Sequence, residues 1–128
     1  MVSHDVGAVD DPRMRERLFV SELEETFAFH LKAKKMLGWL REHKFHPQRR
    51  WRLDFYHPAY NLAVEIEGGA WISGRHTRGA GFIADMLKYN AAAEMGIAVL
   101  RFDGGMVKSG EAIEQVERII NTKKQDAS

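Results

Sequence analysis

The sequence predicts an α/β fold in which a mixed sheet lies between helices. Apolar residues recur at helical spacing from Leu23 to Leu31, then alternate with polar residues through residues 50–67. Residues 97–102 form a short, nearly all-apolar run, typical of a strand buried on both faces. A helical stretch over residues 82–95 separates the two strand regions, and such a crossover gives the last strand a parallel neighbour. The expected order is helix, three strands, helix, strand, helix.

The first helix is predicted to begin at Ser21, because Glu24 three residues later completes a capping-box pattern. Polar residues dominate both ends of the chain. We therefore expect a flexible arm over residues 1–17, a single domain over residues 18–121 and a frayed tail over residues 122–128.

The alternating segment predicts a hairpin with one apolar and one polar face, joined by a turn at residues 57–60. On this pattern, one face of the first strand carries Trp51, Leu53 and Phe55. The polar face gathers three carboxylates, those of Asp54, Glu65 and Glu67. Three acids on one face repel one another unless cations are present.

Composition limits the class of protein. The chain has 128 residues, 45% of them hydrophobic, and a formal net charge of +1, which fits one globular domain and names no partner. It has no cysteine, so disulfides and thiolate metal sites are excluded, as is usual in a reducing cytoplasm. Its six histidines show no H-E-x-x-H spacing, which disfavours zinc. Since no apolar run could span a bilayer, we expect a soluble, cytoplasmic protein.

The acidic face has two interpretations. One is a solvated sheet face on which Arg50 and Arg52 form ordinary cross-strand ion pairs with the glutamates. The other is a site for a hard cation such as magnesium, which carboxylates bind together with water and phosphate oxygens. The Gly68–Gly69 pair, which would let a ligand approach the backbone, favours the second, as does the cationic loop over residues 74–81. So does Lys88, on the helix that follows.

The segments RLDFYHP and LAVEIEGG, followed by D-x-x-K and GIAVLRF, resemble the PD-(D/E)XK nuclease superfamily. The similarity is greatest to its small branch of DUF559-type and very-short-patch-repair-like endonucleases. EIEGGAW, GRHTRGAGF and DMLKYNAAAEMG resemble small phage endonucleases of the Holliday-junction-resolvase type. The resemblance covers about residues 21–103. It implies a restriction-endonuclease-like core and DNA cleavage with Mg²⁺, for which Mn²⁺ could substitute.

The resemblance also implies the metal ligands. Asp54 corresponds to the first motif acid and Glu65 to the second, and the backbone carbonyl of Ile66 would complete the shell. Resolvase-like relatives add a glutamate from the first helix. Glu24 is the expected choice, with Glu22 and Glu25 as alternatives.

The chain departs from the family at the third motif position, where Glu67 replaces the usual lysine. The resemblance leaves Glu67 to position or deprotonate the attacking water, or to hold a second metal. Lys88 is then the candidate for the missing cation, stabilising negative charge as the bond breaks.

Positive charge in two segments predicts DNA contacts, since phosphate contacts dominate affinity for nucleic acid. The candidate residues are Arg75, His76, Arg78, Arg50 and Arg52. The alternative for each is a solvated basic surface. By analogy with resolvases we expect a homodimer acting on branched DNA. A monomeric nicking or mismatch-type endonuclease and a non-catalytic nucleic-acid-binding domain remain the competing functions.

Overall fold

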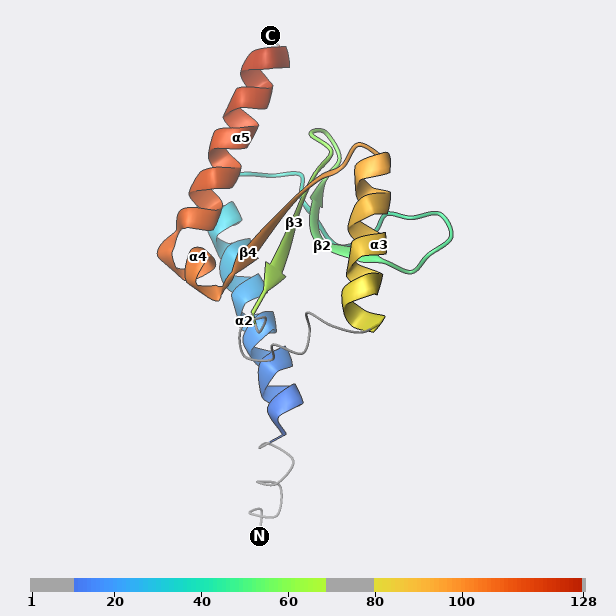
Figure 1. The fold of residues 1–128 in the computed structure, drawn as a ribbon. Coiled ribbons are helices and arrows are strands. Elements are labelled where there is room, and N and C mark those ends of the chain that lie inside the picture. The colour runs from blue at the N-terminus through green and yellow to red at the C-terminus, as the bar shows by residue number, and fades with distance from the viewer. Residues whose placement is uncertain (1–10, 69–79, 128) are drawn as a thin grey trace.

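The structure is a computed structural model that describes residues 11–68 and 80–127 (Figure 1). Its elements follow the predicted order, with one additional short helix, α4. They are α2 (Pro12–Ala33), β1 (Leu40–Lys44), β2 (Arg52–His57), β3 (Leu62–Glu67), α3 (Ala80–Glu94), β4 (Ala98–Asp103), α4 (Gly104–Ser109) and α5 (Glu111–Ala127). The predicted α/β fold is confirmed.

The four strands form one mixed sheet in the order β1-β2-β3-β4. The pairs β1–β2 and β2–β3 are antiparallel, whereas β3 and β4 are parallel and pair from Leu62↔Ala98 to Glu67↔Asp103. α3 provides the predicted crossover between them. α2, α4 and α5 cover one face of the sheet and α3 covers the other (Figure 1).

α2 begins at Pro12, so the predicted start at Ser21 is wrong. The Asp11 side chain accepts a hydrogen bond from the Arg13 backbone N–H at 3.0 Å, and proline suits the first position of a helix. These two residues give a helix start upstream of the capping box, and Ser21 lies within the helix. Residues 12–17 of the predicted arm are therefore helical. At the other end, α5 continues through most of the predicted tail to Ala127.

The core consists of two clusters, one on each face of the sheet. Phe27, Phe55 and Phe102 belong to the larger cluster under α2, α4 and α5, and the rings of Phe27 and Phe55 meet edge to face at 5.1 Å. Leu53 belongs to the second cluster, with Ala92 of α3. Leu53 and Phe55 were predicted to point the same way, which is wrong. The alternation of β2 is broken between them, at Asp54.

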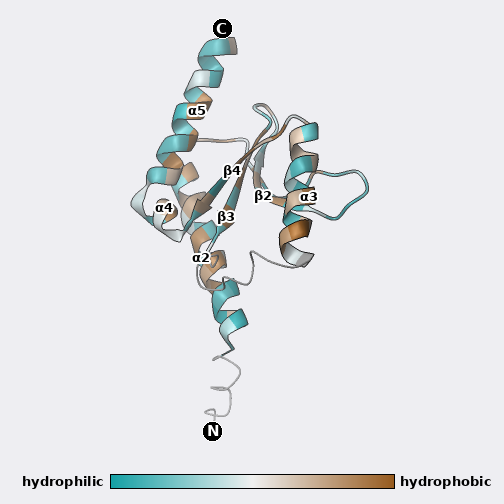
Figure 2. Ribbon diagram, in the orientation of Figure 1, coloured by the Kyte–Doolittle hydropathy of each residue, from teal (hydrophilic) through white to brown (hydrophobic). Residues whose placement is uncertain are grey.

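α3 is apolar on more than the side that packs on the sheet (Figure 2). Phe82 was predicted to be in the core, but it is 39% exposed. Its neighbours on the first turns of α3 are also exposed: Ile83, Met86 and Leu87. Within the described residues, no helix is both long and apolar enough to cross a membrane.

Candidate active site

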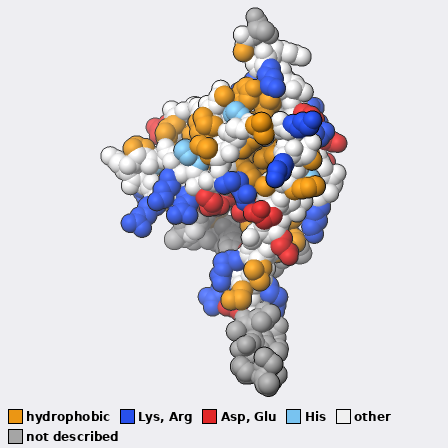
Figure 3. Space-filling model, turned by 180° about the vertical axis from the view of Figure 1, so that it is seen from behind, with side chains coloured by type: hydrophobic (Ala, Val, Ile, Leu, Met, Phe, Trp, Pro, Cys, Tyr) orange, Lys and Arg blue, Asp and Glu red, His pale blue; other side chains and the backbone are white. Residues whose placement is uncertain are grey.

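Three carboxylates from three different elements converge at one side of the sheet. Glu24 of α2, Glu42 of β1 and Asp54 of β2 each place one oxygen within 4.8 Å of the other two. Acidic side chains also gather near the middle of the face shown in Figure 3, with lysine and arginine side chains around them. Glu24 and Asp54 were predicted to join a site, whereas Glu42 was not.

α2 positions Glu24 through its buried neighbours. Leu23 and Phe27, four residues apart on one face of the helix, are almost fully buried in the core. Glu24 flanks this face and is half-buried. The alternatives point elsewhere, since Glu22 is exposed and Glu25 pairs with Arg41 at 2.9 Å.

Glu42 reaches the cluster through an unusual backbone conformation. The pairs Arg41↔Phe55 and His43↔Leu53 place it opposite Asp54 on the neighbouring strand. Its φ is +51°, in the left-handed region that costs a non-glycine residue about 1–2 kcal/mol. Such strain is concentrated at functional sites. β1 is irregular at Glu42 and β2 at Asp54, and these two residues lie opposite each other in the sheet. Both carry a carboxylate.

Asp54 is joined to β3 by two hydrogen bonds, each between a backbone N–H and a side-chain carboxylate. Its Oδ2 accepts the Ile66 backbone N–H at 2.8 Å, and its own N–H donates to Glu65 Oε2 at 2.7 Å. These bonds lie beyond the last backbone pair of the two strands, Phe55↔Val64. Burial, reinforced by the charge of Glu65, raises the pKa of Asp54 to about 7. Burial and the charge of Glu42 also raise the pKa of Glu24. The site therefore favours either protonated carboxyl groups or a bound cation that offsets their negative charge.

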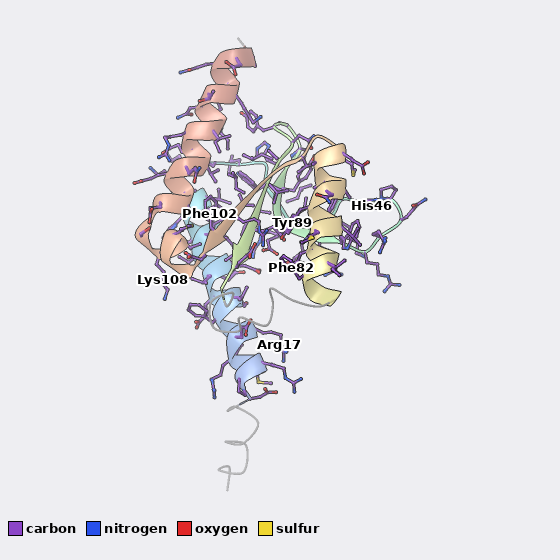
Figure 4. The ribbon with its side chains drawn as sticks, in the orientation of Figure 1. Arg17, His46, Phe82, Tyr89, Phe102 and Lys108 are labelled. Atoms are coloured by element: carbon purple, nitrogen blue, oxygen red, sulfur yellow. The ribbon has the colours of Figure 1, made fainter. Side chains whose placement is uncertain are left out.

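Glu65 is buried, and its carboxylate accepts hydrogen bonds from two side chains of α3. Its Oε1 accepts hydrogen bonds from Lys88 Nζ at 2.7 Å and from the Tyr89 hydroxyl at 2.9 Å. Figure 4 shows Tyr89 on the side of α3 that faces the sheet. Burial and the nearby charge of Glu65 raise the pKa of Tyr89. The phenol therefore stays protonated and donates a hydrogen bond to the carboxylate. Lys88 and Glu65, predicted to act in one site, are in direct contact.

Glu67 is held by an arginine of the neighbouring parallel strand. Both the Nε and an NH₂ group of Arg101 donate to its carboxylate. The guanidinium of Arg101 also lies over the Tyr89 ring, 4.5 Å from its centroid. The cross-strand ion pairs considered for Arg50 and Arg52 are therefore not formed with the glutamates of β3. Arg52 instead lies 3.9 Å from Glu42, and Arg50 is exposed.

Gly68 has a different role from the one predicted. A Cβ at this position would lie 2.8 Å from Val20 Cγ2 and 3.3 Å from Phe19 Cδ2, both on α2. The missing side chain thus lets α2 approach the end of β3, rather than leaving room for a ligand. Gly69 lies outside the described residues.

The remaining predicted residues divide into two groups. Ile66 has a buried side chain, and its N–H binds Asp54. The predicted DNA contacts Arg75, His76 and Arg78 lie outside the described residues.

Sequence reasoning missed three residues of the site: Glu42, Tyr89 and Arg101. Arg101 left a signal, since it is the single charge in the apolar run at residues 97–102. Tyr89 also left one, as the direct neighbour of Lys88. Glu42 left none, because it lies in a basic segment.

No protein-family model matches the chain, and no curated protein matches it. Among solved structures, the chain is similar to the catalytic domain of the homing endonuclease I-Bth0305I. The similarity has a TM-score of 0.57 at 19% sequence identity and covers 75% of this chain and 89% of that one. At this identity the likeness establishes the fold. The chain therefore shares the α/β fold of that domain, and the predicted fold class is confirmed.

Proposed function

We propose that this protein is a divalent-metal-dependent DNA endonuclease. The observation that carries the proposal is the convergence of Glu24, Glu42 and Asp54 next to the buried Glu65–Lys88 pair. A fold shared with an endonuclease catalytic domain supports it. Neither the fold nor an acidic cluster would suffice alone, since one fold carries many functions.

The donor set fits a hard cation. Opposite oxygens around a bound ion are separated by about 4.2 Å for Mg²⁺ and about 4.8 Å for Ca²⁺, twice the metal–oxygen distance. The three carboxylates, with oxygens within 4.8 Å of one another, are close to that size. An all-oxygen set suits magnesium or manganese rather than zinc. Asp54 would be shared between this group and the ligands that the resemblance implies, Glu65 and the Ile66 carbonyl.

When bound, the cation supplies Lewis acidity, which activates water and offsets charge on the phosphate. The side chains of the chain have complementary roles. Lys88 provides a fixed ammonium group for the negative charge that develops on the phosphate. Arg101 fixes the orientation of Glu67, which would position or deprotonate the attacking water. Tyr89 keeps the Glu65 carboxylate oriented.

Branched DNA is the proposed substrate, cut by a homodimer during phage recombination or replication. This finer part rests on the resemblance of the EIEGGAW and GRHTRGAGF segments to resolvase-type proteins. A subunit contact would have an apolar surface available in the exposed residues of α3: Phe82, Ile83, Met86 and Leu87. Arg75, His76 and Arg78, together with Arg50 and Arg52, are the proposed phosphate contacts.

A cleavage assay tests the proposal. The chain is incubated with Mg²⁺ or Mn²⁺ and four-way-junction, nicked, mismatched or linear DNA, with Asp54→Asn as the inactive control. We expect metal-dependent cleavage that favours the junction and is lost in the control. Preference for nicked or mismatched duplex would replace the resolvase role by a nicking or mismatch-type activity. Cleavage by Asp54→Asn at the full rate would refute the site. No cleavage of any substrate with either metal would leave a non-catalytic nucleic-acid-binding domain.

A further inference from the structure

The β1–β2 connection is an ordered projection rather than a plain loop. We call residues 44–52 the basic arm. It extends from the sheet past α3 (Figure 1), and His46 lies on it (Figure 4). The Nδ1 atom of His46 accepts the backbone N–H groups of Gln48 at 3.2 Å and Arg49 at 3.0 Å, which closes the turn.

Aromatic packing anchors the arm to the domain. Phe45 is buried in the core cluster under α3, and the Trp51 ring stacks near it with centroids 6.3 Å apart. The His46 ring meets Trp51 edge to face at 5.1 Å. The guanidinium of Arg49 lies over Trp51, 4.8 Å from the ring centroid. The position of at least one cation is thus fixed by the fold.

The arm carries four cationic side chains and no acidic one: Lys44, Arg49, Arg50 and Arg52. All four are exposed. Arg52 has a carboxylate 3.9 Å away, in Glu42. Lys44, Arg49 and Arg50 form no ion pair with any other residue in the described part of the chain. Like charges held together without counter-ions do not stabilise the fold, and they give the arm a positive potential that attracts an anionic partner.

Protection of a sheet edge does not explain the charge of Arg49 and Arg50. Cations that guard an edge stand on the edge strand itself, as Arg41 and Lys44 do on β1. Arg49 and Arg50 lie beyond the last β1–β2 pair, Lys44↔Arg52. They have no strand edge to protect.

The arm lies next to the acidic cluster. Lys44 follows Glu42 by two residues on β1, and Arg52 precedes Asp54 by two residues on β2. Two residues of a strand span roughly 7 Å. A duplex with one phosphate at the acidic cluster would bring neighbouring phosphates within reach of Lys44 and Arg52 at the base of the arm, and Arg49 and Arg50 continue the positive charge beyond this base.

We propose that the basic arm is a preformed clamp for the phosphate backbone of duplex DNA flanking the cleavage site. This inference rests on the proposed function and adds the surface that holds the substrate. Arg49 and Arg50 contact phosphates, and His46 is a positioning residue that holds the arm in its binding conformation. Because the arm is already ordered, binding does not have to pay for its folding.

Binding of a fluorescent linear duplex to the full chain, in EDTA and over a range of salt concentrations, tests the clamp without cleavage. Each lost phosphate contact lowers the slope of log K against log [salt] by about 0.9. The double substitution Arg49→Ala/Arg50→Ala should therefore reduce the slope by about 1.8, with at least a tenfold loss of affinity near physiological salt. The control is Lys32→Ala/Arg118→Ala, which removes the same charge from exposed sites on α2 and α5. An equal loss in the control, an unchanged slope in the arm variant, or no binding by the unaltered chain would overturn the clamp.

His46 gives a test that changes no formal charge. His46→Ala removes the acceptor that closes the turn, and we expect about a tenfold loss of affinity. His46→Asn offers a side-chain oxygen to the N–H two residues on and should restore most of it. Alanine binding as tightly as histidine would refute the positioning role.

The binding result and the cleavage result separate the two proposals. Cleavage that proceeds normally while Arg49→Ala/Arg50→Ala leaves binding unchanged supports the nuclease and overturns the clamp. Arm-dependent binding without cleavage under any metal supports the clamp and overturns the nuclease.

Discussion

The ammonium group of Lys88 lies 2.7 Å from Oε1 of Glu65, and this ion pair ties α3 to a central strand of the sheet. Their side chains are only 15% and 8% exposed. Tyr89 donates to the same carboxylate oxygen, so α3 supplies both partners of Oε1, while Oε2 accepts the backbone N–H of Asp54. The pair thus has a structural role in addition to the chemical one proposed for each residue.

Lys88→Met should destabilise the domain strongly, because it leaves the buried Glu65 carboxylate without its cation. We expect a loss of about 3 kcal/mol in the free energy of unfolding, measured by urea denaturation at neutral pH. Adding Glu65→Gln to the same chain should recover part of the loss. The matched control is Lys34→Met, which breaks an exposed pair with Glu117 and should cost less than about 1 kcal/mol. If Lys88→Met and Lys34→Met lowered the free energy of unfolding equally, the Lys88–Glu65 pair would not act as a buried structural pair.

Asp54→Asn should stabilise the metal-free protein at alkaline pH. The pKa of Asp54 is about 7 in the folded chain, against an ordinary value of 3.8, so folding favours the protonated form. The stability associated with that proton is complete below about pH 4 and is lost as pH rises through about 7. Asparagine keeps the neutral form at every pH. In EDTA we expect the variant to exceed the parent by about 2 kcal/mol above pH 8, with the gap closing near pH 4.

Urea denaturation across this pH range measures the difference directly. A gap that widens as pH falls would reverse the sign of the predicted linkage and remove the case for a raised pKa. Saturating Mg²⁺ should reverse the order of the two proteins at alkaline pH, since the cation stabilises only the ionised parent.

The order of helices and strands was predictable because hydrophobic periodicity is a local property of the chain. Alternation along β2 and β3 predicted that Asp54 and Glu65 share one face. The two residues do meet, but through the backbone N–H of Asp54, which donates to Glu65 Oε2, while the Asp54 carboxylate joins Glu24 of α2 and the Glu65 carboxylate pairs with Lys88 of α3. Alternation failed where tertiary contacts prevailed. Leu53 and Phe55 pack on opposite faces, since the strand is irregular at Asp54. Glu42 adopts a positive φ that no residue type in its neighbourhood signals. A carboxylate site assembled from three elements is a property of packing, so its third member was out of reach of the sequence.

Glu42→Gln should weaken metal binding about as much as Glu24→Gln does. We expect each to reduce the affinity for Mn²⁺ by tenfold or more in isothermal titration calorimetry, since each removes one anionic ligand. Glu25→Gln is the control, because that side chain neighbours Glu24 in sequence but pairs with Arg41. Retention of full affinity by Glu42→Gln would exclude β1 from the site.

Metal binding should also depend on pH in a defined direction. Because Asp54 must lose its proton to bind a cation, affinity should fall as pH drops below about 7. Titration in buffers of different ionisation enthalpy should then reveal proton release on binding near neutral pH. In Asp54→Asn the proton release should shrink along with the affinity. Binding without proton release at this pH would contradict the assignment of Asp54 as a ligand.

Gly68→Ala should affect both stability and metal binding through α2. The new Cβ would lie 2.8 Å from Val20 Cγ2, closer than real Cβ contacts, so the helix must shift away from the end of β3. Overpacking of this kind costs about 1–3 kcal/mol. The shift would carry Glu24 away from Asp54, so affinity for Mn²⁺ should fall although no ligand is altered. Adding Val20→Ala makes room for the methyl group and should restore both properties in part.

Gly105→Ala is the control, since its Cβ would meet nothing closer than Asp103 Oδ1 at 3.5 Å. If Gly68→Ala lowered stability but left metal affinity unchanged, the contact of α2 with the end of β3 would not control the site.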